Sequence, residues 1–71
     1  MKVLLIEKCS DSMMWYKYCI GCYVPLLREE NDCYWSKEIA GYSNIVRTED
    51  ASIVDVENPK FYTPVRNHAI L

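Results

Sequence analysis

The chain has 71 residues, enough for one domain with a thin core, because so short a chain buries only about 60% of the surface that it exposes when unfolded. Hydrophobic residues make up 51% and charged residues 25%, a balance that excludes an intrinsically disordered protein. The net charge is −2, and the Lys and Arg residues are interleaved with acids, which disfavours a nucleic-acid partner or an anionic membrane surface.

The start of the chain bears on its location in the cell. The apolar run 3–6 is followed at once by Glu7 and Lys8, whereas a secretory signal needs an apolar core of roughly 7–15 residues. No stretch of the sequence approaches the ~20 apolar residues that a membrane-spanning helix requires. We therefore expect a soluble, cytoplasmic protein.

Alternating polarity and enrichment in β-branched and aromatic residues predict five strands, at residues 2–8, 20–28, 33–36, 42–47 and 51–56. Residues 9–19 predict an irregular loop, residues 29–32 a polar turn, and residues 48–50 a single helical turn. Gly21 is suited to a bulge or sharp bend where the second strand begins. Pro25 has no N–H group, so we expect part of that strand's edge to be unpaired or kinked.

These elements predict the fold class. No window of 11 or more residues carries a helical apolar pattern without a break. Five short strands with one helical turn before the last are the layout of an SH3-type domain, and closure into a barrel would protect the strand edges. The sequence predicts an all-β protein with a small five-stranded SH3-like barrel at residues 1–57. A C-terminal tail at residues 58–71, extended or partly disordered, is expected to follow.

Several motifs along the chain carry a family resemblance. They are Trp15-Tyr16, Ile20-Gly21, Tyr34-Trp35, Gly41-Tyr42 and the segment NIVRTEDASIV at residues 44–54. Together they resemble small phage and prophage proteins with a "WY…IG…V" opening and an "NIV.(K/T)EDA.IV" close, over about residues 2–56. In that pattern a charged pair precedes Ile-Gly, whereas Tyr18-Cys19 stands there in this chain. The resemblance implies a phage accessory protein that folds as a barrel, and it assigns no active site.

The four cysteines, at positions 9, 19, 22 and 33, raise the question of a metal site. Cys19 and Cys22 form a C-x2-C pair, and Cys9 and Cys33 could complete a four-thiolate zinc site. A zinc ribbon, however, has two such pairs, and in a strand over 20–28 Cys22 would share a face with Ile20 while Cys19 points elsewhere. We expect no metal and no cofactor, with reduced cysteines acting as small buried hydrophobes, and we keep zinc as the weaker alternative.

Catalytic chemistry finds little support in the sequence. His68 is the only histidine and stands in the C-terminal tail, where a frayed end would not hold a proton-transfer base in place. The paired carboxylates, such as Glu29-Glu30, are expected at turns and on solvated surface. The two isolated glycines form no phosphate-binding loop. The sequence predicts a protein that is not an enzyme.

Aromatic residues are the strongest remaining functional signal, at 13% of the chain. Tyr and Trp dominate binding interfaces because they bury a large area at a low cost in entropy, but a thin core also needs bulky residues. Both interpretations stay open for the set as a whole. The residues predicted to bind a partner are Trp15, Tyr16, Tyr18, Tyr34 and Tyr42.

Two functions follow from these expectations. The first is a phage-type accessory protein that binds a host protein in the cytoplasm of the infected cell, inhibiting a host defence or metabolic enzyme. The second is an oligomeric module that sequesters a small molecule or nucleotide in an aromatic-lined pocket. The tail could also pair with a second copy of the chain and bury Ile70 and Leu71, which would give a homo-oligomer.

Overall fold

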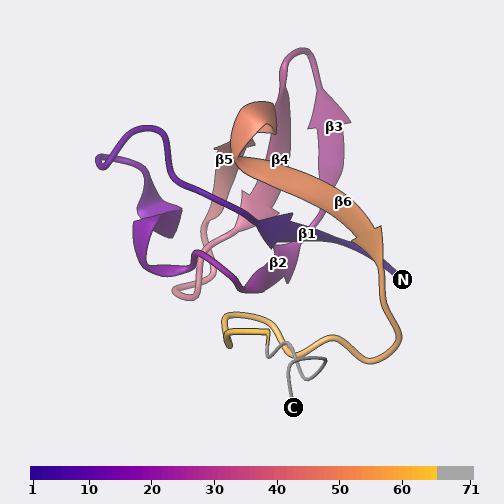
Figure 1. Ribbon diagram of the computed structural model, residues 1–71. Coiled ribbons are helices and arrows are strands. Elements are labelled where there is room, and N and C mark those ends of the chain that lie inside the picture. Colours follow the sequence, from indigo (N-terminus) through magenta and orange to yellow (C-terminus); the bar gives the residue numbers. More distant parts are fainter. Residues whose placement is uncertain (66–71) are drawn as a thin grey trace.

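The protein is a small all-β domain, as the sequence predicts. The computed structural model describes residues 1–65 and contains six strands and two 3-10 turns (Figure 1). The 3-10 turns are η1 (Trp15–Tyr18) and η2 (Thr48–Asp50). The strands are β1 (Lys2–Ile6), β2 (Tyr23–Pro25), β3 (Arg28–Glu30), β4 (Cys33–Lys37), β5 (Ser43–Arg47) and β6 (Ala51–Asp55). No helix in the described part of the chain is long and apolar enough to cross a membrane.

The strands form two antiparallel sheets of three strands each. One sheet has the order β2-β1-β6 and the other β3-β4-β5. Figure 1 shows β1 and β6 side by side, with β3 and β4 forming part of the second layer. Within residues 1–65, no hydrogen-bonded ladder joins the two sheets into a closed barrel.

The predicted second strand is wrong in one respect, because residues 20–28 do not form a single strand. β2 pairs with β1, β3 pairs with β4, and residues 26–27 carry the chain from one sheet to the other. This crossing follows directly after Pro25, which cannot donate a hydrogen bond to a continuing ladder. Glu29 and Glu30 lie in β3 instead of a turn, and the turn itself is confined to residues 31–32, where Asn31 has a φ of 55°.

The core lies between the two sheets and is built from alternating strand positions. Leu4 and Ile6 of β1, Val24 of β2 and Val46 of β5 are all fully buried. They share one apolar cluster with Tyr16, which enters from the loop between β1 and β2. The thin core predicted from the chain length therefore recruits a residue from a loop as its largest fully buried side chain.

The chain after β6 folds back along β2. Tyr62 N–H donates to the Tyr23 carbonyl over 2.9 Å, and Val65 N–H donates to the Gly21 carbonyl over 2.7 Å. The predicted C-terminal tail is thus packed on the domain as far as Val65, where it covers an edge that β2 would otherwise leave unpaired. The predictions for His68, and for Ile70 and Leu71 in a homo-oligomer, lie outside the described residues.

Candidate binding surface

The long loop between β1 and β2 is held down by a buried carboxylate. Asp50 of η2 is fully buried and accepts a hydrogen bond from the Tyr16 hydroxyl group. Asp50 also accepts hydrogen bonds from the Ser10 N–H over 3.2 Å and from the Ser10 hydroxyl over 3.0 Å. In turn, the Arg47 N–H donates to the Tyr16 hydroxyl oxygen over 3.3 Å. These bonds attach both η1 and the start of the loop to the turn that precedes β6.

The electrostatics of this network fix the protonation state of both groups. Burial alone would raise the pKa of Asp50, but the hydrogen bonds from Tyr16 and Ser10 outweigh it and hold the pKa below its ordinary value. Burial, followed by the hydrogen bond to Asp50, raises the pKa of Tyr16 well above its ordinary value. Around neutral pH, Asp50 therefore stays a carboxylate acceptor and Tyr16 stays a hydroxyl donor. The buried hydrogen bond from Tyr16 to Asp50, which we call the latch, therefore holds the loop between β1 and β2 against η2.

Trp15 and Tyr16 both form hydrogen bonds with the backbone of β5. The indole Nε1–H of Trp15 donates to the Ile45 carbonyl over 2.8 Å. The two aromatic rings meet edge to face, with their centroids 5.5 Å apart. Because Tyr16 accepts the Arg47 N–H of the same strand, two aromatic side chains occupy positions where a further strand would otherwise pair.

The opposite side of the same loop presents apolar groups to solvent. Tyr18 is 86% exposed, and together with Trp15 and Cys19 it lines a hollow of about 350 Å³. The other wall comes from the loop between β4 and β5, through Glu38, Ile39 and Ala40. Ile39 is 72% exposed, so two segments far apart in the sequence place large apolar side chains around one hollow.

The predicted partner-binding residues divide into three groups. Tyr18 and Trp15 line the hollow, and Tyr42 is exposed on the loop that carries Ile39. Tyr34 is partly buried and packs against the core. Tyr16 has no exposed surface, so its assignment to a binding face is wrong: the hydroxyl group finds a buried acceptor that the sequence did not reveal.

Ile39 is the large aliphatic residue of the hollow, and it was not among the predicted partner-binding residues. It stands in the connection between β4 and β5, in the interval between the strands predicted at residues 33–36 and 42–47. A large aliphatic side chain at the tip of a short hairpin loop was the available signal, because such loops are usually polar.

The cysteines do not follow the register argued from the sequence. Cys19 and Cys22 both enter the core, because residues 19–22 form a turn in which the Cys22 N–H donates to the Cys19 carbonyl over 2.9 Å. Gly21, with a φ of 85°, allows that turn. Burial raises the pKa of both thiols. Cys9 packs against the same core and Cys33 lies on β4, and no three His, Cys, Asp or Glu side chains in residues 1–65 gather as metal ligands would.

Trp35 lies on the outer face of the second sheet with its own partners. Its Nε1–H donates to Glu30 Oε1 over 2.8 Å, and the Arg28 guanidinium stands 4.9 Å from the ring centroid. The ring is therefore covered by residues of the neighbouring strand β3, and this face offers less free aromatic surface than the hollow beside Tyr18 does.

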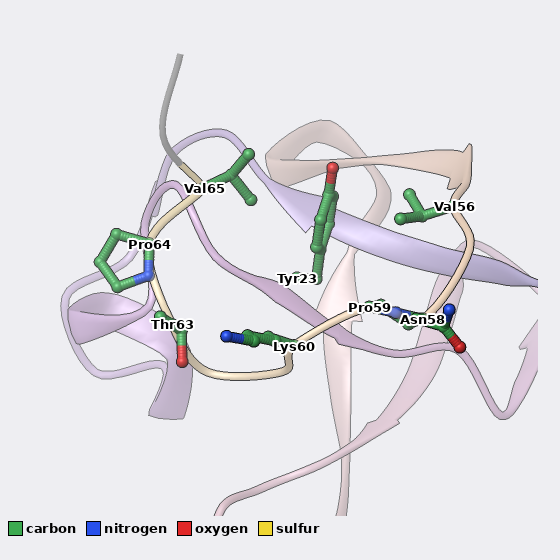
Figure 2. A pocket seen from close by; sticks show the side chains of 8 residues that line it. All are labelled: Tyr23, Val56, Asn58, Pro59, Lys60, Thr63, Pro64 and Val65. Atoms are coloured by element: carbon green, nitrogen blue, oxygen red, sulfur yellow. The ribbon is translucent and has the colours of Figure 1, made fainter. Parts of the chain in front are cut away.

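A further pocket lies where the C-terminal segment meets β2. It has a volume of about 270 Å³, and Figure 2 shows Tyr23 rising between Val56 and Val65. Of the lining residues within the described range 1–65, Lys60 is the only one with a charged side chain. This volume is just below the roughly 300–1,000 Å³ of ordinary small-molecule sites.

Comparison of the chain with protein-family models, with curated proteins and with solved structures finds no match. The arrangement of side chains described above is accordingly the basis for a function.

Proposed function

We propose that this protein is a non-enzymatic binding module that docks a partner protein on the hollow between η1 and the β4–β5 loop. The observation that carries the proposal is the pairing of Tyr18 and Ile39, both largely exposed, on either side of one hollow. Leaving large apolar side chains in water is unfavourable, and a protein partner would bury them. Tyrosine is also among the residues that contribute most to binding free energy.

The rigid attachment of the loop supports this proposal. The latch from Tyr16 to Asp50 and the bond from Trp15 to β5 hold η1 from two directions. A surface that is fixed before binding loses less conformational entropy when the partner arrives. Tyr18 is thus presented from a fixed turn.

The finer fold that we propose is SH3-like. A long loop follows the first strand, the next strand segment is divided between two sheets, and a 3-10 turn precedes a last strand that pairs with the first. The resemblance to small phage and prophage proteins leads us to propose a host protein as the partner, bound in the cytoplasm of the infected cell. Inhibition of a host defence or metabolic enzyme is the activity we propose for that complex.

The alternative, a module that sequesters a small molecule or nucleotide, has less support. The pocket in Figure 2 is small, and among residues 1–65 its lining contains one cationic side chain, Lys60. A nucleotide site would need several donors to meet the phosphate charge. The exposed pair beside η1 therefore favours the protein partner.

The test is capture of a partner from host lysate by the wild-type protein and by the double variant Tyr18→Ser/Ile39→Ser, followed by calorimetric titration with the purified partner. We expect the double variant to fold and to bind at least about 100-fold more weakly, because two apolar anchors are lost.

Met13→Ser is the matched control, because Met13 is 88% exposed but does not line the hollow. It should bind as the wild type does. Equal binding by the double variant, or an equal loss in Met13→Ser, would show that the hollow is not the docking site.

A further inference from the structure

A second apolar hollow is lined in part by the residues that follow Cys19 in the same loop. Its volume is about 340 Å³, and it is lined by Leu5, Ile6, Glu7, Ile20, Gly21 and Val65. Ile20 is 51% exposed, and the Gly21 N–H donates to the Ile6 carbonyl over 2.7 Å, which fixes the loop on β1. Residues 18–19 line the first hollow and residues 20–21 line the second, so the two hollows flank a single short stretch of chain.

In the part of the chain that the structure describes, the residues that line each hollow include one carboxylate and no basic group. Glu38 lines the first hollow and Glu7 the second. Glu38 Oε2 accepts a hydrogen bond from Asn44 Nδ2 over 2.8 Å, and the structure shows no bond to Glu38 Oε1 from residues 1–65. The exposed Glu7 side chain makes no ion pair within the same range. A partner that covers these hollows must compensate both carboxylates, because an unpaired charge is costly to desolvate.

Tyr18 adds a third point of attraction for positive charge. The Lys17 ammonium group stands 5.1 Å from the centroid of the Tyr18 ring, an arrangement in which the electron-rich face of the ring attracts a cation. Lys17 and Tyr18 are both exposed, so a cation of a partner can take the place of Lys17 on this ring.

We infer that the partner presents a cationic, apolar peptide segment: apolar side chains fill the two hollows, and flanking Lys or Arg residues meet Glu7, Glu38 and the Tyr18 ring. This inference rests on the proposed function and specifies the chemistry of its partner. The same two carboxylates disfavour the phosphates of a nucleic acid at the two hollows.

The test uses synthetic peptides that share one pattern of leucines and differ only in their flanking residues, which are Lys, Ser or Glu. Binding is followed by fluorescence polarisation of labelled peptides. We expect the Lys peptide to bind roughly tenfold more tightly than the Ser peptide, with the Glu peptide weakest, and the difference to shrink at high salt.

Charge variants of the protein identify the groups responsible. Glu38→Gln keeps an acceptor for Asn44 and removes the charge, so it should lower the preference for Lys over Ser without unfolding the chain. The double variant Glu7→Lys/Glu38→Lys should prefer the Glu peptide. Lys17→Ala, which frees the Tyr18 ring, should bind the Lys peptide a few-fold more tightly.

The inference is overturned if none of the peptides binds the wild type, or if the order of affinities is the same in the Glu7→Lys/Glu38→Lys variant. The proposed function has a separate outcome, because capture of a host protein that depends on Tyr18 and Ile39 would stand even if that protein met the hollows with an uncharged surface.

Discussion

Tyr16 and Tyr18 are two residues apart in one 3-10 turn, yet their environments are opposite. Tyr16 is fully buried and hydrogen bonded to Asp50, whereas Tyr18 is 86% exposed. A 3-10 helix has three residues per turn, so side chains at positions i and i+2 point in different directions. The turn therefore has an anchored side that contributes to folding and a presenting side that is available to a partner. Residue type alone does not distinguish the two sides.

The largest expected effect concerns the anchored side. Replacing Asp50 by Asn removes the charge that the Tyr16 and Ser10 donors complement and places an NH2 group among those donors. We expect a loss of about 2–4 kcal/mol in the free energy of unfolding, as found when a partner is removed from a buried charged network. Urea titration followed by tryptophan fluorescence measures it.

The control for Asp50→Asn is Glu49→Gln. Glu49 precedes Asp50 in the same 3-10 turn, but its side chain is exposed. Its replacement should change the free energy of unfolding by no more than about 0.5 kcal/mol. A similar loss in both variants would mean that the turn is sensitive to any substitution and that the Asp50 network has no special role.

The pH dependence of stability should come next in size. The folded-state pKa of Asp50 lies below its unfolded value, which is close to 3.8, so the unfolded chain binds the proton more readily. The stabilisation from Asp50 is therefore complete above that pH and is lost as the pH falls through the folded-state value. Unfolding free energies measured from pH 7 down to about pH 2 should fall steeply below about pH 4 in the wild type.

The same titration in Asp50→Asn provides the check. The acid-induced decrease should be clearly smaller in this variant, because the group that takes up the proton is gone. Parallel curves for wild type and variant would assign the acid sensitivity to other carboxylates.

The sequence predicted the fold correctly wherever local patterns determine the elements. The predicted first, third, fourth and fifth strands correspond to β1, β4, β5 and β6, and the helical turn over residues 48–50 coincides with η2. Enrichment in β-branched and aromatic residues favours these elements, and each strand buries or half-buries its middle residues and exposes a polar residue at one or both ends.

The contacts of Tyr16 on the anchored side could not be predicted from the sequence, for a physical reason. The hydrogen bond from Tyr16 to Asp50 joins residues 34 positions apart, and nothing near Asp50 in the sequence distinguishes it from the solvated Glu49. The same limit applies to Cys19 and Cys22: the argument from strand register failed because a turn, not a strand, occupies residues 19–22. A long-range hydrogen bond decided the first case and a local turn the second.

Gly21, in the turn that follows η1, offers a test with a smaller expected effect. Gly21 has a φ of 85°, and no atom lies within 4 Å of the position that a Cβ would occupy. Gly21→Ala should therefore cost only the backbone strain of a left-handed conformation, about 1 kcal/mol. Gly41→Ala, with a φ of 100° and similar free space in the β4–β5 loop, should cost about the same in a thermal melt. A much larger loss in Gly21→Ala alone would show that the loop transmits strain to the latch.

The smallest expected effect concerns the presenting side and separates it most sharply from the anchored side. Tyr18→Ser and Ile39→Ser each remove a side chain that is mostly in water already, so the free energy of unfolding should change by no more than about 0.5 kcal/mol. The same urea titration used for Asp50→Asn measures both. A loss above 1 kcal/mol in either variant would mean that the side chain supports the fold, and the hollow would then owe its apolar lining to packing. Near-zero changes in stability, together with weaker binding, would assign the two side chains to recognition.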